Sequence, residues 1–155
     1  MRSAPLLAVL AMLAATPVIA ESPRVTFAIG QTETQSTALA MTWHSAPRPA
    51  GWSYAAGLYA SSEGGGWIGG GVSYTLRPGN SGFFVRGTVM PGLYHHGSDI
   101  DLGGPIQIGT TVEFGTRLRN DAEVSLMITH RSNAGIYGRN PGVNMVAVAY
   151  TIPLN

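Results

Sequence analysis

The chain of 155 residues contains no cysteine and no lysine, and only 11% of its residues are charged. The absence of cysteine excludes disulfide bonds and thiolate metal sites, so no covalent cross-link holds the fold together. Charged residues make up roughly 25% of an ordinary soluble domain, so this chain has little charge with which to build a surface facing water. Nine basic residues against eight acidic ones also leave no basic field for nucleic acid.

Residues 1–20 have the composition of a secretory signal peptide. A basic second residue precedes an apolar run from Pro5 to about Leu13, and small residues lead to a predicted cleavage point after Ala20. The run is too short to span a bilayer. We therefore expect an exported protein whose mature chain, residues 21–155, forms a single domain.

Long apolar runs are missing from the rest of the chain, which excludes a transmembrane helix. Apolar residues alternate instead with small or polar ones, at the period of a β-strand. Hydrocarbon tolerates strands only in a closed barrel, because every backbone group must be paired. The alternation predicts eight strands, at about residues 24–31, 38–45, 52–61, 66–76, 82–93, 104–118, 122–132 and 142–154.

The two faces of the predicted strands differ sharply in chemistry. In the segment 104–118, Ile, Val, Phe and Leu side chains share one face, while Gln107 and Glu113 lie on the other. An eight-stranded barrel has room inside only for side chains. We expect the charged residues to pair there, as Arg86 and Glu113 would on adjacent strands.

A soluble barrel with its apolar face inward would show the same alternation, but two features favour a membrane barrel. The polar face consists mostly of Gly, Ala, Ser and Thr, which suits a crowded interior better than a solvated exterior. Aromatic residues on the apolar face also fall near one end of their strands, as in the aromatic girdle of outer-membrane barrels. These residues are Phe27, Trp43, Trp52, Tyr74, Phe83 and Tyr150.

The connections orient the predicted barrel in the membrane. Tight turns at residues 78–81 and 119–121 lie at one end. The other end carries the longer segments, at residues 31–37, 61–65, 94–104 and 133–141. Because outer-membrane barrels have short periplasmic turns and long external loops, these segments are expected outside the cell.

A histidine and a serine near the external end of the seventh strand carry the clearest catalytic chemistry. His130 and Ser132 are two residues apart, so they emerge on the same face of the strand. This is the minimum geometry for a serine nucleophile activated by a histidine base. The pair continues the lipid-facing stripe, where unpaired polar groups cost several kcal/mol. A polar strand end without catalytic function would show the same short pattern.

Asn144 is the predicted third member of the site. A hairpin that pairs residue 130 with residue 144 places the two side chains about 5 Å apart. The amide oxygen of Asn144 can then orient the imidazole of His130, as in Cys-His-Asn enzymes. Asp99 or Asp101, in the loop 94–104, are alternative sources of charge near the site.

The pattern His-x-Ser-Asn-Ala-Gly at residues 130–135, with Asn-Pro-Gly at 140–142 and a closing strand ending Ile-Pro-Leu, resembles the lipid A 3-O-deacylase family of the PagL type. The resemblance implies an eight-stranded barrel in the outer membrane of a Gram-negative bacterium. It implies hydrolysis of the ester at position 3 of lipid A, the lipid of lipopolysaccharide, with release of a 3-hydroxy fatty acid. It implies no cofactor and no metal.

The resemblance also assigns roles to individual residues. Ser132 would be the nucleophile and His130 the general base. The backbone N–H of Gly135 and the side chain of Asn140 would stabilise the oxyanion, with Asn133 supporting the loop. The family has a glutamate where this chain has Asn144, and an amide cannot neutralise the imidazolium that forms during the reaction.

Four further side chains have chemistry suited to binding. Arg139, near the site, suits the phosphates of lipid A because a guanidinium group binds phosphate well, whereas the parity of Arg131 points it inward. His95 and His96 are neighbours on an extended segment and are expected to point apart, so no metal site is predicted.

Two other functions remain open at this stage, a small outer-membrane barrel with a structural or adhesive role and a deacylase homologue that has lost its activity. The sequence also leaves open whether the chain acts alone or as a homodimer.

Overall fold

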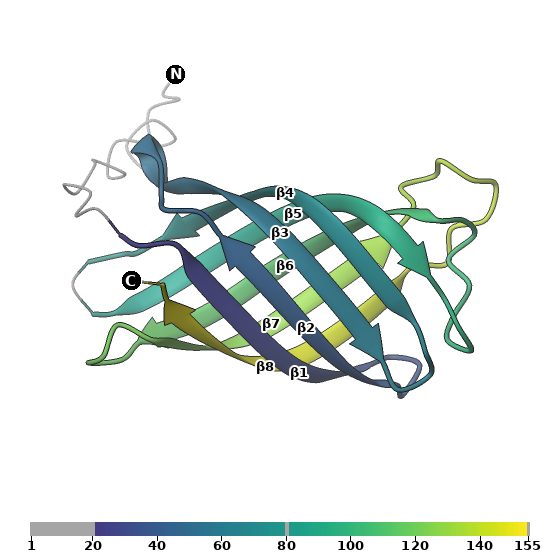
Figure 1. Cartoon of the computed structure of the whole chain (residues 1–155), viewed down its shortest axis with the longest axis horizontal. Coiled ribbons are helices and arrows are strands. Elements are labelled where there is room, and N and C mark those ends of the chain that lie inside the picture. The colour runs from purple at the N-terminus through teal and green to yellow at the C-terminus, as the bar shows by residue number, and fades with distance from the viewer. Residues whose placement is uncertain (1–20, 80, 155) are drawn as a thin grey trace, which may run out of the picture.

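The computed structural model describes residues 21–79 and 81–154 and consists of a closed barrel of antiparallel strands (Figure 1). Each strand pairs with its neighbours in sequence, and β8 closes the barrel by pairing with β1. The predicted fold class is therefore confirmed. The predicted signal peptide lies outside the described residues. The strands are β1 (Arg24–Thr32), β2 (Thr37–His44), β3 (Trp52–Ser61), β4 (Gly66–Leu76), β5 (Phe83–His95), β6 (Ile106–Arg117), β7 (Glu123–Ser132) and β8 (Val143–Pro153).

The connections differ in part from those expected. The β1–β2 and β3–β4 connections, at residues 33–36 and 62–65, are short. The β1–β2 connection is shorter than the predicted 31–37, because β1 continues to Thr32 and β2 begins at Thr37. A short 3-10 turn, η1 (Pro49–Gly51), occupies the β2–β3 connection at the opposite end. Only the β5–β6 and β7–β8 connections are long loops, and they lie together at the end of the barrel away from the C-terminus (Figure 1).

No helix in the described part of the chain has the length and hydropathy needed to cross a membrane.

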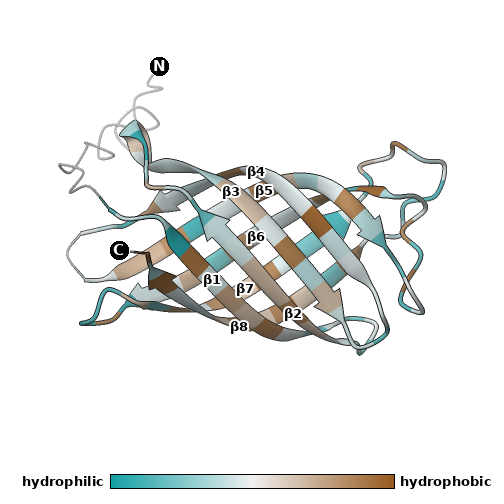
Figure 2. Cartoon of the chain, viewed as in Figure 1, coloured by the Kyte–Doolittle hydropathy of each residue, from teal (hydrophilic) through white to brown (hydrophobic). Residues whose placement is uncertain are grey.

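The outer wall of the barrel is apolar, as the alternation predicts. Figure 2 shows hydrophobic residues recurring along the strands, and large side chains such as Ile68, Leu93 and Val148 are 57%, 60% and 65% exposed. An exposed apolar surface that encircles a protein is unfavourable in water and suits hydrocarbon. The lipid-facing assignment of these side chains therefore agrees with the structure.

The predicted aromatic girdle lies at the end of the barrel where β1 begins. Phe27 pairs across the seam with Tyr150, and Trp52 pairs with Tyr74. Five of the six aromatic side chains are exposed, and the sixth, Trp52, is half-buried. The guanidinium carbon of Arg48 lies 5.3 Å from the centroid of the Trp52 ring. These aromatic side chains mark the interfacial level at that end of the barrel.

A cluster of charged residues fills the barrel interior near the same end. The predicted pair of Arg86 and Glu113 is confirmed, with 3.3 Å between the guanidinium and the carboxylate. Glu123, which the sequence did not single out, is fully buried and contacts three arginines. Its carboxylate lies 2.5 Å from Arg86, 2.5 Å from Arg77 and 3.5 Å from Arg24. These ion pairs compensate charges that would otherwise be buried alone.

We predict that Glu123→Gln destabilises the barrel, because the arginines around it lose their common counter-charge. Breaking a buried ion pair from one side costs about 3–5 kcal/mol. Urea titration of the barrel in detergent, followed by the heat-modifiable band on gels, measures the change. Glu63→Gln, in the exposed β3–β4 connection, is the matched control and should leave the midpoint nearly unchanged. Equal midpoints for the two variants would contradict the prediction.

Candidate active site

The predicted site residues come together on the outer wall at the rim with the two long loops. His130 on β7 stands opposite Asn144 on β8, which confirms the register expected from the sequence. His130 and Asn144 are exposed, and Ser132 is half-buried. All three side chains follow the outward parity of their strands, so the site faces the surroundings of the barrel and not its interior.

A hydrogen bond joins His130 and Asn144. His130 Nδ1 and Asn144 Oδ1 are 2.8 Å apart. Gly142 leaves room for the imidazole, because a Cβ at this position would lie 2.9 Å from His130 Cε1. Its φ of +69° also favours glycine. In the part of the chain that is described, the Ser132 hydroxyl makes no hydrogen bond, whereas the His130 ring has Asn144 as its partner.

Asn133, next to Ser132, organises the β7–β8 loop. Its side chain is fully buried, and its Nδ2 donates to the carbonyl oxygens of Leu102 at 2.7 Å and Arg139 at 2.6 Å. Its Oδ1 accepts from the N–H of Gly135 at 2.9 Å, and its own N–H donates to Asn140 Oδ1 at 3.0 Å. One asparagine thus fixes the positions of both residues expected to stabilise an oxyanion.

The backbone directly after this asparagine is strained. Ala134 has a φ of 51° and Gly135 a φ of 81°. A non-glycine residue in the left-handed region costs roughly 1–2 kcal/mol. Such strain persists where neighbouring contacts enforce it, and it often accompanies function. Here the contacts of Asn133 on both sides of the turn enforce it.

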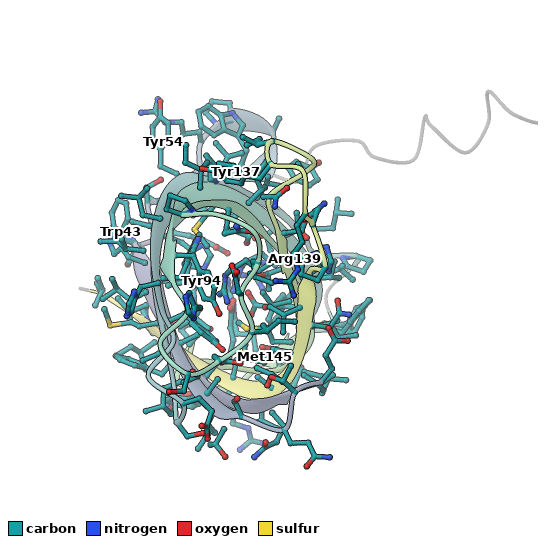
Figure 3. The ribbon with its side chains drawn as sticks, turned by 90° about the vertical axis from the view of Figure 1, so that its right-hand side faces the viewer. Trp43, Tyr54, Tyr94, Tyr137, Arg139 and Met145 are labelled. Atoms are coloured by element: carbon teal, nitrogen blue, oxygen red, sulfur yellow. The ribbon has the colours of Figure 1, made fainter. Side chains whose placement is uncertain are left out.

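The long β5–β6 loop packs against the β7–β8 loop and supports the site from the side. A Cβ on Gly104 would collide with the ring of Tyr137, so only glycine allows this approach. The Tyr137 hydroxyl accepts a hydrogen bond from the N–H of Ile106 at 3.3 Å. Arg139 lies 3.5 Å from Asp101 of the opposite loop. Figure 3, which looks into the barrel from this end, shows Tyr137 and Arg139 on the loop at the rim.

Arg131 lies between His130 and Ser132 on β7 and points into the barrel, as its parity predicts. Its guanidinium is buried 4.0 Å from the ring centroid of Tyr59, 5.1 Å from that of Trp67 and 5.7 Å from that of Tyr94. Tyr94 is visible inside the barrel wall in Figure 3. These cation–π contacts anchor the strand end that carries the site.

Two expectations about the neighbourhood of the site are wrong. Asp99 hydrogen-bonds with Thr34, and Asp101 pairs with Arg139, so neither aspartate contacts His130 among the described residues. The rings of His95 and His96 do not point apart but stack, with centroids 5.9 Å apart. No group of three or more side chains able to hold a metal ion occurs within residues 21–79 and 81–154.

The carboxylate nearest to the site belongs to Glu33, which sequence reasoning missed. It accepts hydrogen bonds from Asn144 Nδ2 at 3.0 Å and from the Asn144 N–H at 3.1 Å. Glu33 follows β1 at outward parity, and barrel closure sets β1 beside β8. The outward parity of Glu33 can be read from the sequence, but its position beside Asn144 follows only from the register between β1 and β8.

A family model and several solved structures are similar to this chain. The family model described as lipid A 3-O-deacylase (PagL) matches residues 23–153. None of the curated protein sequences compared with the chain matches it.

Among solved structures, the crystal structure of the outer membrane enzyme PagL matches with a TM-score of 0.72 and 17% identity, covering 84% of this chain and 99% of that one. Neisserial surface protein A matches with a TM-score of 0.60 and 11% identity, covering 85% and 96%. A de novo designed transmembrane β-barrel matches with a TM-score of 0.58 and 14% identity, covering 87% and 97%.

At these identities the structural likenesses establish only the fold, a small barrel of the outer-membrane type. The family model adds the relationship in sequence, and it spans nearly all of the barrel. The chain therefore belongs to the lipid A 3-O-deacylase (PagL) family.

Proposed function

We propose that this protein is an outer-membrane esterase that removes the 3-O-linked acyl chain of lipid A by a serine mechanism. The observation that supports this most directly is the 2.8 Å hydrogen bond between His130 and Asn144, formed beside Ser132 on the lipid-facing wall. Polar side chains that face hydrocarbon cost free energy unless they are paired, so apolar side chains would stabilise the barrel better at these positions. Membership of the deacylase family supplies the reaction class.

In the proposed reaction, His130 Nε2 takes the proton of Ser132 as its Oγ attacks the carbonyl carbon of the ester. The imidazolium then gives this proton to the sugar oxygen at position 3, which leaves as a hydroxyl group. The acyl chain remains on Ser132 as an ester. Water attacks this ester while His130 accepts its proton, and the proton returns to Ser132 as the 3-hydroxy fatty acid departs.

Asn144 serves as the group that orients the base. Its Oδ1 accepts a hydrogen bond from the His130 Nδ1–H, which leaves the lone pair of Nε2 available for the serine. The serine and histidine are not hydrogen-bonded in the free protein, which is common before substrate binds.

Two groups on the β7–β8 loop are assigned to the developing oxyanion. Asn140 Oδ1 already accepts a hydrogen bond from the N–H of Asn133, so Asn140 Nδ2 is the end of that amide left to donate. The N–H of Gly135 is the second donor, and in the free protein it donates to Asn133 Oδ1. Donors fixed by neighbours before the reaction stabilise a transition state well, because they need little reorganisation.

The surroundings of the site suit a lipid substrate that enters from the outer leaflet. Below the site, the outward side chains of Ile128 and Val146 continue the apolar wall along which acyl chains can lie. Above it, Arg139 is exposed and its pair with Asp101 is solvent-accessible, so its guanidinium can exchange this partner for a phosphate of lipid A. We further propose export through cleavage of residues 1–20 in a Gram-negative cell.

Mass spectrometry of lipid A tests this function. In a Gram-negative host without such an enzyme, expression of the chain should remove one 3-hydroxyacyl group. Ser132→Ala should abolish the change and leave the heat-modifiable folded band intact, because one rim hydroxyl adds little to stability. Ser62→Ala, in an exposed connection, is the matched control. Unchanged lipid A with the folded parent would contradict the proposal and favour a structural or adhesive barrel.

A second prediction concerns the orienting amide. Asn144→Ala should lower kcat by roughly 10–10³-fold with little change in KM, because the histidine loses control of its tautomer. Detergent-solubilised protein and purified lipid A provide the assay. Val146→Ala, the next lipid-facing position on β8, should keep turnover within about threefold as the packing control. Parental turnover in Asn144→Ala would show that the amide is a bystander.

A further inference from the structure

We propose that Glu33 is a positioning residue of the site, whose carboxylate holds the Asn144 amide in the one orientation that makes His130 a base. The inference rests on the proposed function and extends the site to a third strand. It assigns a role in the chemistry to the β1–β2 connection, which lies 111 residues from Asn144 in sequence.

Glu33, Asn144 and His130 form one continuous row on the outer wall. The carboxylate of Glu33 receives Asn144 Nδ2 at 3.0 Å and the Asn144 N–H at 3.1 Å. The Glu33 N–H donates to the Asn144 carbonyl oxygen at 3.0 Å. On the other side of the amide, Asn144 Oδ1 lies 2.8 Å from His130 Nδ1.

The register of the barrel creates this row. Thr32, the last residue of β1, pairs with Met145, so the next rung sets Glu33 opposite Asn144. On the other edge of β8, Asn144 pairs with His130. Directly opposed side chains in antiparallel strands lie about 5 Å apart, which allows an amide to bridge two neighbours.

The chemistry of the groups fixes the direction of every hydrogen bond in the row. A carboxylate only accepts, so the amide must turn its NH₂ group toward Glu33. Its oxygen then faces His130, and because this oxygen also only accepts, the proton of the neutral imidazole must be on Nδ1. Nε2 is then the basic nitrogen of the ring, the one that can accept the proton of Ser132.

Among the described residues, Glu33 is the acceptor that Asn144 Nδ2 contacts, so without this carboxylate either end of the amide could face His130. The flipped amide would donate its NH₂ to His130 Nδ1 and favour the tautomer that carries its proton on Nε2. That tautomer cannot accept the proton of the serine. The carboxylate of Glu33 also polarises the amide between it and His130, and the hydrogen-bonded row transmits part of its attraction to the positive charge that forms on His130.

The tautomer of His130 provides a direct test that does not depend on activity. Nitrogen NMR of ¹⁵N-histidine-labelled protein at alkaline pH, with the signal assigned by its loss in His130→Gln, reports which nitrogen carries the proton. We expect Nδ1–H to dominate in the parent and a mixture of tautomers in Glu33→Gln, whose own amide can pair with either end of Asn144. Glu33→Ala should give a mixture as well, and Glu63→Gln is the matched control. An unchanged tautomer ratio in both Glu33 variants would overturn the inference.

Kinetics on purified lipid A supply the second readout. Glu33→Gln should lower kcat about 10-fold at similar KM, as removal of a supporting hydrogen bond typically does. Moving the carboxylate by the double change Glu33→Gln and Asn144→Glu should restore kcat to within about threefold of the parent, because a carboxylate then contacts Nδ1–H directly. A residue that only seals the β1–β8 seam would give no recovery, and that result would also overturn the inference.

These measurements separate the two proposals. A folded parent without deacylase activity would contradict the proposed function, yet the tautomer ratio would still decide the role of Glu33. If the parent is active but the tautomer ratio of His130 does not change in the Glu33 variants, the proposed function stands and the positioning role of Glu33 is refuted.

Discussion

The pairing of β1 with β8 is the contact on which the rest of the molecule depends. A strand edge exposed to hydrocarbon would leave a row of backbone N–H and C=O groups without partners, and each would cost several kcal/mol. The ladder from Arg24–Pro153 to Thr32–Met145 removes that edge. The same ladder fixes which residue of the β1–β2 connection meets β8. Closure therefore satisfies the backbone and, in the same step, sets Glu33 against Asn144.

Closure also divides the side chains into two environments with opposite demands. The outer wall is apolar, and His130, Ser132 and Asn144 interrupt it at the rim with the two long loops. The interior contains charges, but they are compensated in a cluster around Glu123 near one end. Near the other end, Arg131 lies among aromatic rings behind the site. The strand that carries His130 and Ser132 is thus anchored from inside, which gives a surface site the rigidity that catalysis requires.

An amide in the third position of the site is consistent with a working base when its orientation is imposed from outside. An isolated asparagine can present either its oxygen or its nitrogen to an imidazole, and the two choices select opposite tautomers. Here the hydrogen bonds from Asn144 to Glu33 remove that freedom. The arrangement keeps the charged group one strand away from His130, while the neutral amide makes the direct contact. In the proposed site, orientation and charge would come from two different residues.

The sequence by itself determined the barrel, its lipid-facing wall, the interior pair Arg86–Glu113 and the meeting of His130 with Asn144. All of these follow from period-2 alternation and from one hairpin, which are local properties of the chain. The β1–β2 connection is shorter than the predicted 31–37, because β1 and β2 continue through Thr32 and Thr37, polar residues that the apolar pattern does not mark. Only the tertiary structure decided that Glu123 joins the interior cluster and that Glu33, not Asp99 or Asp101, lies beside the site. Those contacts depend on barrel closure and on the packing of side chains inside it, which bring together residues that no local pattern connects.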